Sequence, residues 1–159
     1  MSTIKVDTYL TRGGASEIAI DKLKGVTAAG SMLVVGEGGT NTTNLQQGLV
    51  KSWLNFNGTG TIAARDSFNH SGLTDVSQGN YTVTMASAMG NVNYSFNGGL
   101  ADSGTGGVRS VMFGFNYDSG NLDPNFTTTS HSINTLYPNS GGDEYDVEFI
   151  CIQICGDLA

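Results

Sequence analysis

The sequence predicts an all-β fold: an antiparallel β-sandwich or barrel of about seven strands, with an extended N-terminal arm and one short helix. Three observations point to it. Gly supplies 23 of the 159 residues, and Thr, Ser and Asn are also abundant; these residues favour turns and exposed strand faces over long helices. Apolar and polar residues alternate in short runs, which is the period of a half-buried strand. Turn-forming sequences separate these runs at the spacing typical of sandwiches and barrels.

Residues 1–44 form the predicted arm, and residues 45–159 form the globular β domain. The arm holds short apolar stretches separated by glycines, and Tyr9 is its only aromatic residue. Each stretch is too short to bury its own apolar side. We therefore expect the arm to pack against the globular domain or another copy of the chain, which favours an oligomer.

The best helix candidate runs from Asn44 to Trp53. Asn44 suits the N-cap position, and Leu45, Leu49 and Trp53 recur on one helical face. Gly48 weakens the helix by about 1 kcal/mol. We expect one or two helical turns that lead into a strand.

A β-hairpin follows. Residues 53–56 read as a strand that ends at the turn-forming sequence Asn57-Gly58-Thr59-Gly60. Residues 61–68 read as the second strand. Further strands are expected at residues 81–85, 92–96, 111–117, 126–133 and 145–155.

Two of these segments carry a more specific expectation. Residues 145–155 are apolar on both faces towards their end, which predicts a central strand covered on both sides. The glycine-rich residues 98–109 are predicted to be a mobile loop. Asn97-Gly98-Gly99 is expected to interrupt the strand before it.

Composition excludes several classes of partner. The formal net charge is −7, and only 13% of the residues are charged. No basic patch is present to neutralise phosphates, which argues against nucleic-acid binding and against an anionic membrane surface. No apolar run reaches the roughly 18 residues of a membrane span, and the opening residues lack the apolar segment of a signal peptide. We expect synthesis in a cytosol and export, if any, by another route such as lysis of a host.

The search for chemistry yields no catalytic, cofactor-binding or metal-ligating residue. No nucleophile elbow or phosphate loop is present. His70 and His131 lack a second ligand at metal-binding spacing, and both are expected at the surface. The acidic residues 143–146 could bind Ca²⁺ through oxygen atoms, but they are expected to form a solvated loop.

Cys151 and Cys155 lie four residues apart in a predicted strand, on one face and about 13 Å from each other. A disulfide needs a much shorter distance, so they cannot pair with each other while the strand is intact. They are predicted to be small buried apolar residues, with metal binding or a bridge between chains as the alternatives.

Aromatic side chains at the ends of strands could stack on sugars, and the candidates for this role are Phe68, Tyr94, Tyr117, Phe126 and Tyr137. Tyr94 and Tyr117 belong to alternating patterns, which favours the core. Tyr137 and Phe126 remain as candidates for a surface that contacts a host.

Three pieces of the chain resemble a known family. Residues 45–69, from Leu45-Gln46-Gln47-Gly48 to Asp66-Ser67-Phe68-Asn69, are similar to a segment that recurs in tail-fibre-like virion surface proteins of marine bacteriophages, including those that infect cyanobacteria. Residues 2–7 with 11–14, and the closing residues 156–159, also resemble this family. Residues 97–140 show no such likeness.

The resemblance implies a non-enzymatic structural protein of the virion surface, a tail-fibre or tail-tip component. It implies a homotrimer that attaches to other virion proteins by its N-terminal arm and contacts a host surface glycan or protein. At most about 44 residues precede the globular part, which leaves room for the alternative of a capsid decoration or knob protein. A glycan-cleaving enzyme is a further alternative, because two nearby carboxylates would suffice.

The segment with the family likeness is interpreted physically as a folding unit without an active site. Its expected key residues are Trp53 and Phe56 as core anchors, Gly58 and Gly60 in the turn, and Arg65 and Asp66 as an ion pair beside it. If Trp53 is a core anchor, its replacement by alanine should destabilise the fold by about 3–5 kcal/mol.

Overall fold

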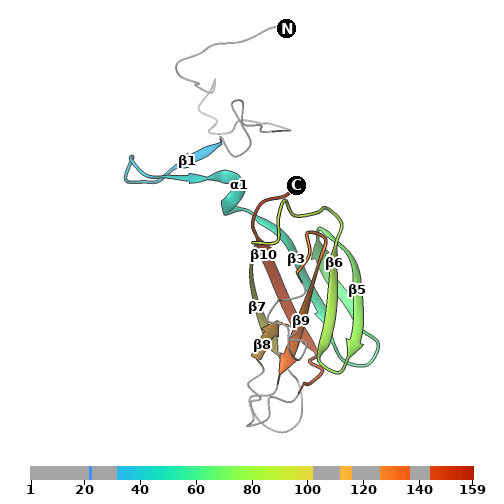
Figure 1. The fold of residues 1–159 in the computed structure, drawn as a ribbon. Coiled ribbons are helices and arrows are strands. Elements are labelled where there is room, and N and C mark those ends of the chain that lie inside the picture. The colour runs from blue at the N-terminus through green and yellow to red at the C-terminus, as the bar shows by residue number, and fades with distance from the viewer. Residues whose placement is uncertain (1–21, 23–31, 102–111, 116–125, 137–143) are drawn as a thin grey trace, which may run out of the picture.

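The computed structural model describes residues 22, 32–101, 112–115, 126–136 and 144–159. It confirms the predicted fold class, because two antiparallel sheets of four strands pack face to face as a β-sandwich (Figure 1). The first sheet has the order β4 (Ala63–Phe68), β3 (Val50–Asn57), β10 (Phe149–Cys155) and β7 (Ser95–Ala101). The second has the order β5 (His70–Ser77), β6 (Asn80–Met85), β9 (Ser130–Leu136) and β8 (Met112–Phe115).

The core lies between the two sheets and follows the alternation of the strands. Leu54 and Phe56 of β3 face inward and are buried, and so are Tyr81 and Val83 of β6. The rings of Phe56 and Tyr81 meet edge to face, with 5.2 Å between centroids and an interplanar angle of 75°. Phe56 is therefore confirmed as a core anchor that joins the sheets.

The predicted hairpin is confirmed as β3 and β4, which pair antiparallel around the turn at residues 58–62. Gly60 has φ +62° in this turn, and a Cβ there would meet open space. Gly58 has the opposite problem, because a Cβ would lie 2.8 Å from Val147 O and 2.5 Å from the Tyr81 hydroxyl. Gly60 is therefore required by backbone conformation, and Gly58 is required by close packing.

The turn between β5 and β6 also needs glycine. Gly79 has φ +70°, and a Cβ there would lie 2.6 Å from Tyr145 N and 2.7 Å from Thr135 O. Both neighbours are backbone atoms, which cannot move aside as a flexible side chain can. Any other residue at position 79 is therefore opposed by conformation and by sterics together.

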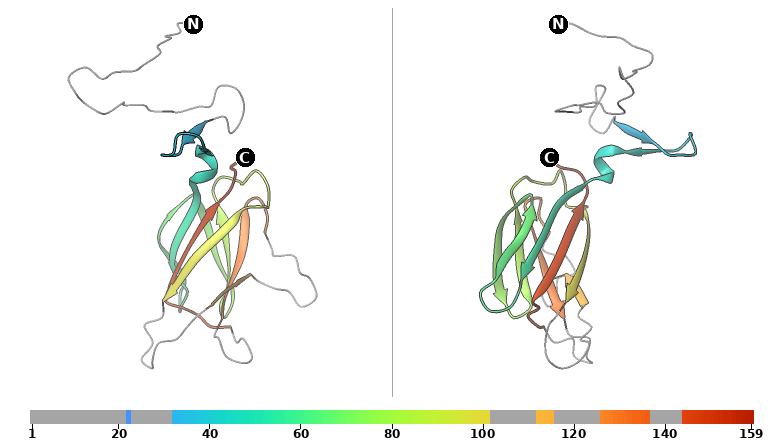
Figure 2. Two further views of the ribbon diagram at one scale, coloured as in Figure 1. Left: turned by 90° about the vertical axis from the view of Figure 1, so that its left-hand side faces the viewer. Right: turned by 180° about the vertical axis from the view of Figure 1, so that it is seen from behind.

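The described part of the arm is a small hairpin joined to the sandwich by one helical turn. β1 (Leu33–Val35) pairs with β2 (Thr42–Asn44), and α1 (Leu45–Gly48) leads into β3. The predicted N-cap is confirmed, since Asn44 Oδ1 accepts hydrogen bonds from Gln46 N at 2.9 Å and Gln47 N at 3.2 Å. Figures 1 and 2 show the hairpin standing beyond one end of the sandwich, near the C-terminus.

The expected short helix that leads into a strand is confirmed as a single turn, but the proposed helical face of Leu45, Leu49 and Trp53 does not exist. β3 begins at Val50, so Trp53 belongs to a strand. The buried Lys51 helps to end the helix, because its Nζ donates to the carbonyls of Gln46 and Leu49. A cation at the C-terminal carbonyls of a helix is favourable.

Three strand predictions need correction. β5 was missed altogether. β7 continues through Gly98 and Gly99, where an interruption and a mobile loop were expected; the rest of that segment, residues 102–109, lies outside the described residues. β10 is central in its sheet but covered on one face only, since Ile150, Ile152 and Ile154 are buried while the residues between them are exposed.

Candidate functional site

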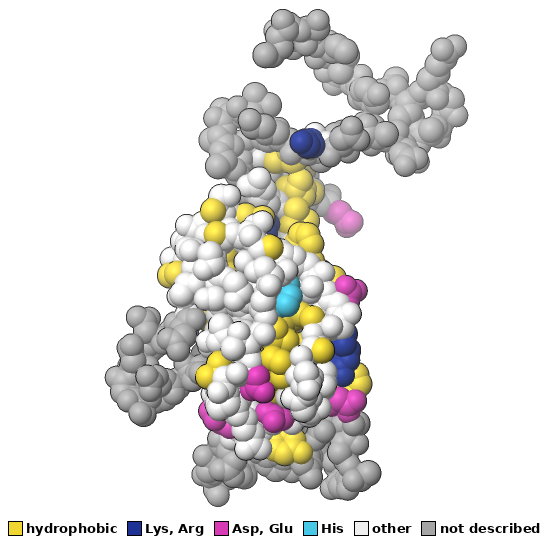
Figure 3. All heavy atoms as spheres, turned by 90° about the vertical axis from the view of Figure 1, so that its right-hand side faces the viewer, with side chains coloured by type: hydrophobic (Ala, Val, Ile, Leu, Met, Phe, Trp, Pro, Cys, Tyr) yellow, Lys and Arg dark blue, Asp and Glu magenta, His cyan; other side chains and the backbone are white. Residues whose placement is uncertain are grey.

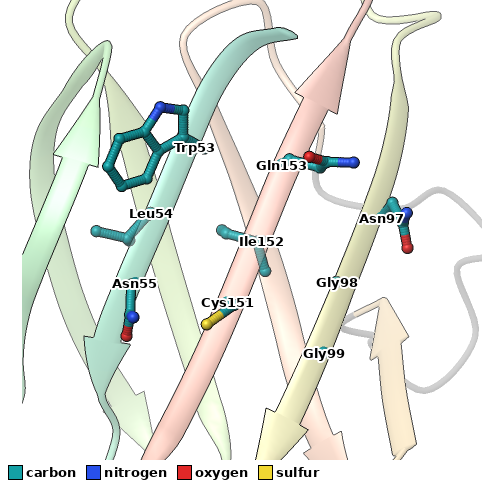
Figure 4. A pocket seen from close by; sticks show the side chains of 9 residues that line it. All are labelled: Trp53, Leu54, Asn55, Asn97, Gly98, Gly99, Cys151, Ile152 and Gln153. Atoms are coloured by element: carbon teal, nitrogen blue, oxygen red, sulfur yellow. The ribbon is translucent and has the colours of Figure 1, made fainter.

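A shallow groove of about 450 Å³ runs across the outer face of β3, β10 and β7 (Figure 4). Its outward-facing residues form two rows that follow from the strand register. One row is Trp53, Gln153 and Asn97, and the other is Asn55, Cys151 and Gly99. The buried Leu54 and Ile152 lie on the inward side of the same strands.

Gly99 is the residue of β7 that leaves the outer face of this strand without a side chain in the groove. Gly99 carries no side chain, and a Cβ built there meets nothing within 4 Å. Figure 4 shows Gln153 extending from β10 towards β7, with Cys151 on the β3 side of β10. The surface beside β10 is therefore hollowed where a larger residue on β7 would fill it.

The groove is lined by amides, a thiol and an indole. The lining set includes no Asp, Glu, Lys or Arg. The Oδ1 of Asn55 is buried and has no hydrogen-bond partner among the described residues. On the β4 side, Phe68 pairs with Trp53 across the strands and is 52% exposed, and it lines a separate depression with Leu49, Val50 and Leu158.

This arrangement corrects the prediction for Trp53. Its side chain is half-buried on the outer face of the sheet and takes no part in the two buried core clusters. The predicted ion pair of Arg65 and Asp66 is also wrong. Arg65 lies 4.2 Å above the Phe149 ring and donates to Glu148 O at 2.8 Å, whereas Asp66 Oδ1 accepts from Ser67 N.

Of the two aromatic residues proposed for host contact, the structure describes only Phe126. Tyr137 lies outside the described residues. Phe126 is half-buried and stacks on Tyr94, with 5.1 Å between ring centroids, at the second core cluster. Its position is internal packing, so the expectation of an exposed contact surface is corrected for Phe126. Tyr94 is buried as predicted, and burial raises its pKa to about 12.

Both cysteines are free, and the structure corrects the prediction that they are buried. Cys151 is exposed at the floor of the groove, and Cys155 is half-buried on the same face of β10. They lie on one strand without bonding to each other, as their spacing predicts.

The histidines differ from expectation. His70 begins β5 and is half-buried. His131 on β9 is completely buried, not exposed, and its two ring nitrogens have no hydrogen-bond partner among the described residues. Burial, and then the charge of His70, lower the pKa of His131 to about 4.

The acidic residues just before β10 accept hydrogen bonds from other parts of the sandwich. Asp146 Oδ1 accepts from Gly79 N at 2.7 Å and lies 3.1 Å from the hydroxyl of Tyr81, which also donates to Gly58 O at 2.8 Å. Burial, followed by the charge of Asp146, raises the pKa of Tyr81 above its usual value. Glu144 Oε1 accepts from Asn134 Nδ2 on β9, so Asp146 binds the turn at Gly79 and Glu144 binds a neighbouring strand.

Exposed apolar side chains gather at the other end, where the hairpin and α1 join the sandwich (Figure 3). We name this set the apolar collar; its members are Leu33, Val34, Val35, Leu49, Val50 and Leu158. A depression of about 340 Å³ lies among Leu49, Val50 and Leu158. All three residues of β1 are between 50% and 59% exposed, so both faces of this strand meet solvent.

Two further observations concern metal binding and membrane-spanning helices. No three His, Cys, Asp or Glu side chains come together as a metal-binding group within the described ranges. In the same part of the chain, no helix has the length and apolar character needed to cross a membrane.

Comparisons of the chain with protein families, with curated proteins and with solved structures find no match.

Proposed function

We propose that the protein is a non-enzymatic structural component of a bacteriophage particle surface, at the tail fibre or tail tip. The observation that carries the proposal is the concentration of exposed apolar side chains at one end, since six of the ten large apolar residues exposed among the described residues belong to the collar. The apolar collar lies at the hairpin end, and the sandwich beyond it has a sparsely charged surface. The collar attaches the chain, and the sandwich faces the host.

The collar needs a partner because β1 is exposed on both of its faces. Leu33 and Val35 point to one side of the hairpin and Val34 to the other. A single flat partner covers only one of these faces. Association of several copies around the hairpins covers both, which supports self-association; the resemblance implies that the copies number three and that they contact other virion proteins through the N-terminal end.

The resemblance of residues 45–69 to tail-fibre-like proteins favours the tail. A capsid decoration protein is the second candidate, favoured by the same concentration of apolar surface at one end, because a knob also docks through a single end. The two functions share a fold and differ in location on the particle.

The location is tested by antibody–gold labelling of intact virions, read by electron microscopy. Label at the tail is the expected result. Label scattered over the head would replace the tail with capsid decoration. A particle without any label, from a preparation in which the protein is detected in the infected cell, would refute a virion component altogether.

The oligomer is tested by light scattering on the purified chain at micromolar concentration. We expect the mass of three chains. Val34→Asp in the collar should shift the protein to monomer, since it places a charge in the interface. Val76→Asp is the matched control, because Val76 is similarly exposed but lies on β5 of the sandwich. A monomeric wild type would contradict the proposed trimer.

A further inference from the structure

The groove across β3, β10 and β7 has the dimensions of a small saccharide site. Three neighbouring strands span about 10 Å, and two outward residues along a strand span about 7 Å. Gly99 lines this groove, and a Cβ built there would enter open space, so the row of Asn55, Cys151 and Gly99 leaves room for a group of the ligand. A ligand that sits here lies on the sheet and projects one group into the hollow.

The lining chemistry selects the class of ligand. Asn97 and Gln153 present amides, each of which both donates and accepts hydrogen bonds, as a sugar hydroxyl does. Trp53 offers an apolar ring face with a polar N–H, which suits the mixed apolar and polar faces of a sugar ring. Phe68 pairs with Trp53 across β3 and β4, but its side chain lines the collar depression and not the groove.

The absence of charged residues from the groove limits the class of sugar that it can bind. The lining residues carry no formal charge, so a sulfated or acidic sugar would find no cation to pair with in the groove. Asn55 gives independent support for a ligand that donates hydrogen bonds, because its Oδ1 has no hydrogen-bond partner among the described residues. A buried acceptor of this kind is usually paired, and rotation of the Asn55 side chain towards a bound hydroxyl would pair it.

From this geometry we propose that the groove binds a neutral oligosaccharide. Trp53 stacks on one sugar ring, Asn97 and Gln153 bind its hydroxyls, and the hollow at Gly99 accepts a substituent of the ring. The use of the groove in host contact rests on the proposed exposure of the sandwich on a virion, whereas saccharide binding itself does not.

A protein partner fits the groove less well. A flat surface laid across the sheet would leave the hollow at Gly99 unfilled and would remove the amides from water without directed partners. The apolar surface that favours contact between copies lies instead in the collar. The groove and the collar therefore have different occupants.

The proposal is tested with the full chain on an array of immobilised neutral, acidic and sulfated oligosaccharides, followed by calorimetry on each ligand found. The central variant is Gly99→Leu, which fills the hollow at a position where a Cβ meets no neighbour. Ala101→Leu is the control, since it places a leucine on the same face of β7 outside the groove. Gln153→Ala is a second groove variant for use if Gly99→Leu does not fold.

Cys151 provides a readout of occupancy that does not depend on substitution. Alkylation by iodoacetamide should slow at Cys151 when the saccharide is bound and stay unchanged at Cys155, four residues along the strand and outside the groove. The adducts are counted by mass spectrometry.

We expect a neutral saccharide to bind, with affinity weakened about tenfold or more by Gly99→Leu, a loss of about 1.4 kcal/mol, and unchanged by Ala101→Leu. Binding of acidic or sulfated glycans alone, or no binding at millimolar concentration, would overturn the proposal. So would neutral binding that Gly99→Leu leaves intact, or a change of oligomeric state caused by Gly99→Leu, which would identify the groove as a contact between copies. Failure of virion labelling would leave these results unaffected.

Discussion

A fall in pH should destabilise the sandwich through His131. The side chain is 0% exposed and lies among the rings of Tyr94, Phe96 and Phe126, with centroid distances of 6.4, 6.3 and 6.3 Å. Its ring nitrogens have no hydrogen-bond partner among the described residues. An imidazolium here would be a buried charge without a counter-ion, and the positive charge of His70 opposes it further.

The size of the effect follows from the difference between the two pKa values of His131. The pKa is about 4 in the folded protein and 6.5 in the unfolded chain. Above pH 6.5 both states hold the neutral ring, so the full stability is present. Between pH 6.5 and 4 only the unfolded state binds the proton, and stability falls by about 1.4 kcal/mol for each pH unit. The total loss is about 3 kcal/mol.

The assay is urea unfolding at fixed protein concentration and at several pH values between 7.5 and 4, compared between the wild type and His131→Leu. Leucine removes the titrating group and two unpaired polar atoms from the core. At pH 7.5 we expect the variant to be within about 1 kcal/mol of the wild type, or more stable. At pH 4.5 the variant should have gained about 2–3 kcal/mol relative to the wild type.

The reasoning would be refuted by a difference between the two proteins that stays constant from pH 7.5 to 4.5. That result would mean that His131 protonates equally easily in both states. His70→Gln supplies a second check. Because burial is the larger cause of the lowered pKa and His70 the smaller, this variant should reduce the pH-dependent loss only slightly.

Five substitutions test the packing. Trp53→Ala should destabilise the protein by about 1–2 kcal/mol, because the side chain is half-buried on the outer face, whereas Phe56→Ala should remove about 3–5 kcal/mol. Gly79→Ala should destabilise by about 2–4 kcal/mol through the combined strain and backbone clash, and Gly60→Ala, with open space at its Cβ, by only about 1 kcal/mol. Tyr81→Phe should lose about 1–2 kcal/mol with its buried hydrogen bonds. All are measured by urea unfolding at pH 7.5.

Each comparison has an outcome that would contradict the structure. Equal losses of unfolding free energy for Trp53→Ala and Phe56→Ala would mean that Trp53 is packed in the core after all. Equal losses for the two glycine variants would mean that the crowding around position 79 is absent. A Tyr81→Phe variant as stable as the wild type would show that its hydroxyl has no stabilising partners.

Local signals predicted the parts of the fold whose sequence pattern and surroundings agree. The alternation around Tyr81 and Val83 identifies β6, a strand with one covered face. The turn Asn57–Gly60 identifies the first hairpin, and Asn44 identifies the cap of α1. In each case the residues that carry the signal are neighbours in the sequence, so no knowledge of distant contacts is needed.

Edge strands were harder to predict because their pattern is weak. β5 lies at the edge of its sheet and is mostly exposed on both faces, so few apolar residues mark it. β7 is also an edge strand, and Gly98 and Gly99 suggested a break. Its hydrogen bonds to β10 hold it extended regardless, because pairing along a whole ladder outweighs the low strand propensity of two glycines.

The position of Trp53 shows that the alternation of side chains along a strand must be considered together with their hydrophobicity. Trp53 and Phe56 are three residues apart, and an odd separation in a strand places two side chains on opposite faces, so both could not be core anchors. Which face is inward depends on the opposite sheet, where Tyr81 meets the ring of Phe56 and donates to Gly58. The groove follows the same logic, because its rows join three strands that are distant in sequence, and only the register of β3, β10 and β7 brings Trp53 beside its amides.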